Sequence, residues 1–187
     1  MQKLISFFES IGFNGTDLEK SVSAFEYKVF QRNDFVVEAG KTSKHIALVE
    51  SGLFQYYVIK DGEERTTYVS VPNTFLASLL SFVSGTPSLE NVRALTQGSL
   101  FMISKINLKR LVNEIPAFKD FYIDLLERSI VGIDASRHDL IVLTAEQRYA
   151  RMLQEEPHFL QQIPLLHLAS MLGITPRHLS RIRKNHQ

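Results

Sequence analysis

The chain has 187 residues, of which 44% are hydrophobic and 22% charged, as is ordinary for a globular protein of one large or two small domains. Its formal net charge of +1 favours no class of partner by itself. The absence of cysteine excludes disulfides, thiolate zinc sites and cysteine-ligated iron–sulfur clusters.

The first segment, MQKLISFFESIGF, lacks the basic region and long apolar core of a secretory signal. No window approaches the ~20 apolar residues that a membrane-spanning helix needs. We therefore expect a cytoplasmic protein with no membrane partner. Residues 1–24 are expected to be helical, because Leu4, Phe7, Phe8 and Ile11 fall on one helical face.

Residues 25–104 carry the pattern of a β-domain. Short runs rich in Val, Ile, Tyr, Phe and Thr are separated by glycine or polar turns, and these runs are FEYKVFQ, DFVVEAG, HIALVESG, LFQYYVIK, RTTYVSV and LFMIS. Asp61-Gly62 is a strong hairpin signal, since both central positions of a type I′ turn need positive φ. Many short strands at this spacing predict a sandwich or barrel.

Residues 105–156 turn helical, and Pro116 to Leu143 is expected to be one helix of about 40 Å. Its apolar side chains recur every three or four residues, which gives the helix one apolar seam. A seam of this length needs a partner. The helix either packs on its own domain or pairs with a second copy of itself.

The last helical segments form a predicted helix–turn–helix. Leu165, Leu168, Ala169 and Leu172 share one face, Gly173 ends the first helix, and Thr175 and Pro176 suit the start of the second. Leu179 and Ile182 are expected to point inward, while basic side chains cover the other face.

The charge of this end favours DNA as a partner. Residues 157–187 contain no Asp or Glu and carry Arg177, Arg181, Arg183 and Lys184, so the rest of the chain is mildly acidic. We expect base contacts from the start of the second helix, by Arg177, His178 and Arg181. Phosphate contacts are expected from Thr175, Ser180, Arg183 and Lys184.

The whole chain resembles a regulator of the Crp–Fnr family, the catabolite-activator type. Gly40 and Gly52 are similar to the paired roll glycines, VRALTQGSLFMIS follows in family order, LTAEQRYARML resembles the hinge and LASMLGITPRHLSRIRK resembles the helix–turn–helix. The resemblance implies an α+β fold with a jelly-roll sensor domain at 1–115, a dimerisation helix at 116–143 and a DNA-binding domain at 144–187. Wing strands, where the family has them, are expected here only around residues 155–163.

This resemblance implies a homodimer that binds double-stranded DNA, with RNA polymerase as a further partner to which no residue is assigned. It gives the long helix a second copy as its partner. The residues predicted to lie in that interface are Phe118, Tyr122, Leu125, Ile133 and Leu140.

The chain departs from the phosphate cassette of the cyclic-nucleotide-binding members. Ala77-Ser78-Leu79 stands in place of Gly-Glu-Leu, and Ser88-Leu89-Glu90 in place of Arg-Ser-Ala. The arginine that neutralises the cyclic phosphate is therefore missing, and Glu90 nearby would repel that phosphate, so we do not expect cyclic AMP to bind in the usual way. The resemblance leaves room for a neutral effector, with a pocket lined by Phe54, Tyr56, Thr67, Ser78, Ser88, Asn91, Ile133 and Asp134.

No catalytic arrangement and no metal site is predicted, since His167 and His178 are far apart and have no acidic partner. The sequence therefore favours a sequence-specific DNA-binding regulator over an enzyme. The alternative is a small-ligand-binding module with a degenerate helix–turn–helix that acts through protein contacts.

Overall fold

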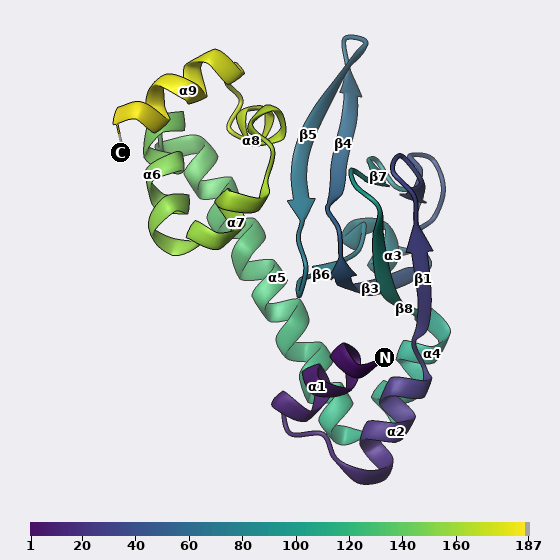
Figure 1. Cartoon of the computed structure of the whole chain (residues 1–187). Coiled ribbons are helices and arrows are strands. Elements are labelled where there is room, and N and C mark those ends of the chain that lie inside the picture. Colours follow the sequence, from purple (N-terminus) through teal and green to yellow (C-terminus); the bar gives the residue numbers. More distant parts are fainter. Residues whose placement is uncertain (186–187) are drawn as a thin grey trace.

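The computed structural model describes residues 1–185, and its elements follow the predicted order of helices, strands and helices (Figure 1). The strands are β1 Glu26–Phe30, β2 Phe35–Val37, β3 His45–Ser51, β4 Phe54–Lys60, β5 Glu63–Ser70, β6 Phe75–Leu76, β7 Asn91–Ala94 and β8 Gly98–Ser104. The helices are α1 Gln2–Ser10, α2 Gly15–Ser23, α3 Leu79–Ser84, α4 Lys105–Glu114, α5 Pro116–Val142, α6 Ala145–Glu155, α7 Pro157–Gln162, α8 Leu165–Met171 and α9 Pro176–Asn185.

The strands form a roll of two four-stranded antiparallel sheets, with orders β1-β8-β3-β6 and β2-β7-β4-β5. A core of alternating inward side chains, including Phe30, Phe54 and Leu100, fills the space between them. The turn at Gly52 brings two backbone segments together: a Cβ on Gly52 would lie 2.6 Å from the Cα of Gly98. The β4–β5 hairpin turns at Asp61 and Gly62, both at positive φ, as the sequence predicts.

A second core joins the N-terminal helices to one side of the roll. Phe8, Phe101 and Phe118 are each no more than 1% exposed there, and Phe121 packs at its edge. The first half of α5 is thus held by its own chain. Ile11, predicted to share the inward face of α1, is 43% exposed because α1 ends at Ser10.

The second half of α5 leaves the roll and reaches the C-terminal helices (Figure 1). Its apolar side chains are largely uncovered, with Ile133 59% and Leu140 63% exposed. The predicted long helix is therefore present, and its seam has an intrachain partner over only half its length.

The C-terminal helices enclose a third core, which extends into the roll. Leu160, Leu168 and Leu179 are buried together with Val69 and Val71, and Val69 lies on β5. Residues 144–185 therefore share their core with the roll.

Wing strands were expected only around residues 155–163, and α7 occupies this place. Pro157 opens α7, where its missing N–H costs nothing. Within residues 105–185 every regular element is helical. No helix of the described part of the chain is long and apolar enough to cross a membrane.

Candidate nucleic-acid interface and sensor site

The turn between α8 and α9 has the geometry that its residues predict. Gly173 adopts φ +69°, and the N–H groups of Gly173 and Ile174 donate to the carbonyls of Ser170 and Ala169. These two bonds are the Schellman motif that ends a helix. The His178 N–H donates to Thr175 Oγ1 at 3.2 Å, so Thr175 caps α9.

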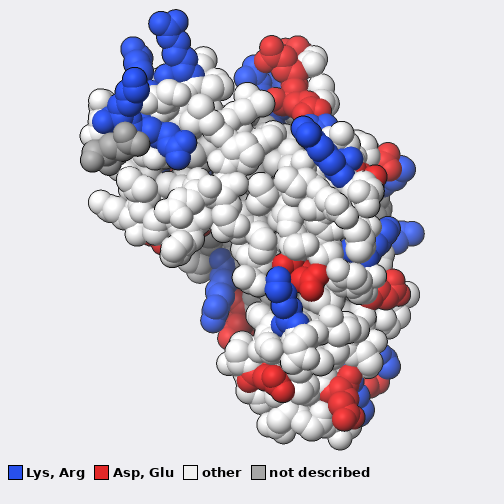
Figure 2. All heavy atoms as spheres, viewed as in Figure 1, with Lys and Arg blue, Asp and Glu red and all other residues white. Residues whose placement is uncertain are grey.

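The inward face of α9 is formed by Leu179 and Ile182, which are at most 2% exposed. The opposite face presents Arg177, Arg181 and Lys184 to solvent. None of these three cations has an ion-pair partner among residues 1–185. Figure 2 shows Lys and Arg gathered at the end of the molecule that α9 forms, whereas the tip of the β4–β5 hairpin carries both charges.

The other predicted DNA contacts are placed less freely. His178 and Thr175 are exposed, while Ser180 and Arg183 are half-buried. The Ser180 hydroxyl donates to the Pro176 carbonyl at 2.9 Å within its own helix. The first turn of α9 is thus the most accessible part of the predicted reading surface.

A contact that was not predicted from the sequence ties α6 to the turn between α8 and α9. Thr144 and Gln147 form a capping box at the start of α6. Arg148, one turn later, donates through Nη2 to the Leu172 carbonyl at 2.8 Å, which ties α6 to the end of α8. A cation beside a helix C-terminus complements the helix dipole, so this favourable pairing was the one general rule that pointed to the contact of Arg148 with the end of α8.

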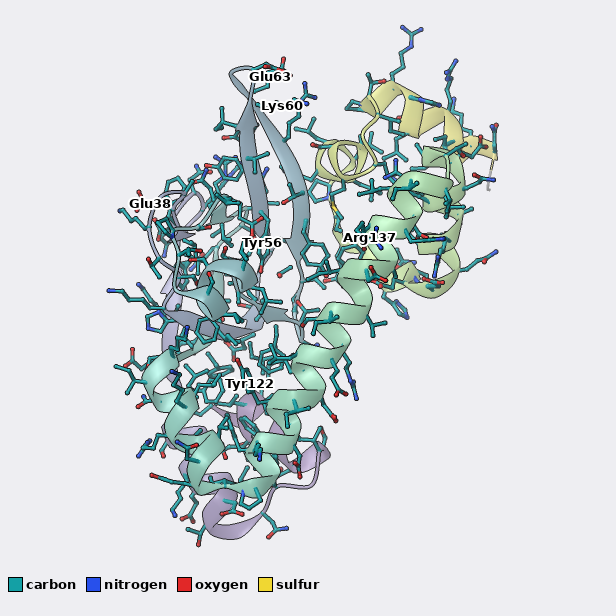
Figure 3. All side chains as sticks on the ribbon, turned by 180° about the vertical axis from the view of Figure 1, so that it is seen from behind. Glu38, Tyr56, Lys60, Glu63, Tyr122 and Arg137 are labelled. Atoms are coloured by element: carbon teal, nitrogen blue, oxygen red, sulfur yellow. The ribbon has the colours of Figure 1, made fainter. Side chains whose placement is uncertain are left out.

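The candidate sensor site centres on hydroxyl groups near α3. Tyr56, on β4 within the roll (Figure 3), accepts a bond from the Ala77 N–H at 3.0 Å. Ser78 Oγ lies 2.9 Å from Ser88 Oγ, and both serines are buried. At Ala77, which stands in place of the first cassette residue, the backbone N–H is thus hydrogen-bonded by a side chain of the protein itself.

Glu90 completes this cluster. Its carboxylate accepts long bonds of 3.4 Å from Ser78 Oγ and from Thr67 Oγ1. Burial raises the pKa of Glu90, an effect that these two hydroxyls partly oppose. An anion placed here would meet a carboxylate in place of a cation.

Comparisons with known proteins agree on the architecture. Residues 27–114 match the family model of the cyclic nucleotide-binding domain. The catabolite activator protein of Thermus thermophilus superposes with a TM-score of 0.60 at 19% identity, covering 93% of this chain and 84% of that one. FixK2 of Bradyrhizobium japonicum gives 0.73 at 14% identity, with coverage of 86% and 83%.

A chain from Eubacterium rectale, assigned to the Crp/Fnr family of transcriptional regulators, gives a TM-score of 0.63 at 15% identity, covering 92% of this chain and 83% of that one. The chain has a Crp–Fnr-like fold. No curated protein sequence matches it. At these identities the solved structures show the fold alone, and they confirm the predicted α+β architecture with its roll, long helix and C-terminal helices.

The structure brings together only part of the predicted ligand pocket. Tyr56, Ser78 and Ser88 converge near α3, and Thr67 reaches them through Glu90. Asn91 instead accepts from the Ala39 N–H at 2.9 Å and braces the loop after β2. Phe54 is fully buried against Phe30 in the core of the roll, with ring centroids 5.9 Å apart.

The prediction that Ile133 and Asp134 line this pocket is wrong, because both are exposed on the part of α5 that leaves the roll. Asp134 pairs at 2.8 Å with Arg137 on the same helix. Figure 3 labels Arg137 on the part of α5 near the C-terminal helices. Two cavities lie elsewhere. One of about 280 Å³ is bounded by α3, α4 and α5, and one of about 170 Å³ lies between β2 and β3.

The structure also divides the predicted dimerisation residues. Phe118 is only 1% exposed because its own chain buries it, so the prediction that it lies in an interface between copies is wrong. Tyr122 and Leu125 are half-buried, and Tyr122 lines the larger cavity. Ile133 and Leu140 remain available to a second copy.

Proposed function

We propose that the Crp–Fnr-like chain is a transcriptional regulator that binds double-stranded DNA with α9 as its recognition helix. The unpaired basic face of α9 is the observation that carries this proposal. Arginine at the exposed start of a helix can donate two bonds to a guanine edge, and exposed cations further along reach phosphates. An acid-free surface around them favours a polyanion.

The roles of single residues separate in a salt titration. Arg181→Ala should cost about 1–3 kcal/mol of specific binding if Arg181 reads a base. Lys184→Ala should weaken all duplexes alike and reduce the slope of log K against log salt by about 0.9. Lys20→Ala is the control, because Lys20 is exposed on α2 at the other end of the molecule (Figure 1).

A duplex affinity that does not change with salt concentration would contradict the proposed DNA-binding role. The alternative would then stand: a ligand-binding module with a degenerate helix–turn–helix that acts through protein contacts. No group of three or more His, Asp and Glu side chains among the described residues could hold a metal ion.

The proposed regulator acts as a homodimer through the second half of α5. Exposed side chains of Ile130, Ile133, Leu140 and Ile141 make this segment apolar, which suits pairing with a second copy. Leu140→Glu should convert the dimer to a monomer in a mass measurement. Leu166→Glu is a matched control, since Leu166 on α8 is equally exposed at 63%.

The same proposal includes indifference to cyclic AMP. Glu90 and the Ser78–Ser88 pair stand where a cyclic phosphate would need a cation, and Tyr56 holds the Ala77 N–H. Burying an anion beside a carboxylate is unfavourable. Calorimetric titration with cyclic AMP should give no binding heat, and saturable binding would contradict this part of the proposal.

A further inference from the structure

The described part of the helix–turn–helix unit, residues 144–185, cannot close its own core. It contains helices only, and a unit this short buries too little apolar surface to be stable alone. Val69 and Val71 of the roll are 0% and 5% exposed because Phe159, Leu160 and Leu168 lie in the same cluster. The roll thus supplies the sheet that covers these helices.

A polar contact fixes where α8 sits on β5. β5 is an edge strand and is paired only with β4. The alternate N–H groups of β5 that point outward therefore have no partner strand. The Thr66 N–H donates to Ser170 Oγ on α8 at 2.9 Å. Thr66 Oγ1 lies 3.1 Å from His167 Nδ1, one turn earlier on α8.

Thr66 is itself held from within the roll. Its hydroxyl accepts from Gln55 Nε2 at 2.8 Å, and Gln55 accepts from Arg93 Nε at 3.1 Å. Gln55 and Thr66 are both buried. The contact with α8 therefore rests on three neighbouring strands, β5, β4 and β7.

An aromatic contact lies beside the polar one. The rings of Tyr68 on β5 and Phe159 on α7 are stacked, with centroids 5.7 Å apart and planes at 23°. Stacking of this kind adds to the area that it covers. Two helices of the unit, α7 and α8, are thus attached to one strand.

The attachment leaves α9 free. Contact with β5 is made by α7 and α8. Arg177, Arg181 and Lys184 stay exposed on α9, and Lys and Arg gather at the end of the molecule that α9 forms (Figures 1 and 2). The docked arrangement thus presents the reading face to DNA and does not cover it.

We propose that β5 positions the recognition helix for DNA, with Thr66 and Tyr68 as positioning residues of the roll. This inference rests on the proposed dimeric DNA-binding function. Two recognition helices must match two half-sites about one DNA turn apart. A helix unit fixed to its roll keeps that distance constant, and a unit that swings on its attachment tolerates other distances.

The test compares two exposed tyrosines of the roll. Tyr68→Ser removes the stack on Phe159, whereas Tyr27→Ser removes a ring contact with Phe101 on the other sheet. Tyr68 is 41% and Tyr27 51% exposed, and Tyr68→Ser also removes an edge contact with the Tyr56 ring. The probe is the duplex that the parent selects from a random pool, made also with its half-sites one base pair closer and one further apart.

Tyr68→Ser should lose about two- to tenfold in affinity for the selected duplex, as expected for one aromatic contact. It should also discriminate less between the three spacings, while Tyr27→Ser matches the parent. A purely structural loss would lower binding at every spacing equally. An unchanged spacing profile in Tyr68→Ser, or tighter binding, would overturn the positioning role.

A second measurement tests the attachment without DNA. Ser170→Ala removes the acceptor of the Thr66 N–H, and Ser129→Ala removes a hydroxyl that bonds only within α5. Hydrogen exchange of the α8 amides should be faster in Ser170→Ala and unchanged in Ser129→Ala. Equal exchange in both would overturn the inference, whereas a parent that selects no duplex would overturn the proposed function alone.

Discussion

Thr175 bears both on the stability of α9 and on the proposed contact of α9 with DNA. Its Oγ1 accepts the His178 N–H at 3.2 Å, and its side chain is exposed at the start of the proposed recognition helix. Thr175→Ala removes this cap and should lower the free energy of unfolding by about 1 kcal/mol. That corresponds to about a fivefold change in the folding equilibrium.

Two further variants separate the cap from the DNA contact. Thr175→Ser keeps the hydroxyl and should match the parent in urea unfolding and in duplex binding. Thr175→Asp also caps a helix, and its charge suits a helix N-terminus, so the unfolding free energy should not fall. The carboxylate would repel phosphates, however, and duplex affinity should drop.

Unfolding and duplex binding are measured on the same four proteins at one salt concentration. If Thr175→Ala unfolds at the parent's urea concentration, the cap contributes nothing. If Thr175→Asp binds duplex as tightly as the parent, the start of α9 does not face the phosphates, and the reading face is wrongly placed.

Three further predictions concern the roll and its contact with α8. Gly52→Ala should cost about 2 kcal/mol more in urea unfolding than Gly40→Ala, because both have positive φ but only Gly52 has a backbone neighbour, Gly98, within clashing distance. Burial, together with the charge of nearby Arg93, lowers the pKa of His167. The stability that neutral His167 contributes is therefore present above about pH 6.5 and is lost as the pH falls through the folded pKa. His167→Asn should make the melting temperature fall less steeply as the pH is lowered. Burial raises the pKa of Glu90, so its ionised form opposes folding at neutral pH, and Glu90→Gln should increase the unfolding free energy at pH 7.

Local signals predicted the helices and their ends well. The glycine at position 173 and the Thr175-Pro176 pair define a turn through backbone geometry alone, and the structure has that turn. Leu168 and Leu179 were predicted to point inward from spacing, and both are fully buried. The Asp61-Gly62 hairpin is similar, because positive φ at both positions restricts the turn type.

Long-range contacts were not predictable in the same way. An apolar seam on α5 does not say what covers it, so Phe118 and Leu140 looked alike, although one is 1% and the other 63% exposed. Ile133 was expected to line a pocket of the roll, but it is 59% exposed in the second half of α5, which leaves the roll (Figure 1). The contact of Thr66 with Ser170 joins residues more than a hundred positions apart, and neither residue type is distinctive.

Selection of bound duplexes from a random DNA pool by the full chain, at physiological salt, tests the central claim most directly. The account predicts enrichment of a palindrome whose half-sites lie about one DNA turn apart, as two copies of α9 require. Absence of any enriched sequence, from the purified chain and from the chain supplied with cell extract, would contradict it.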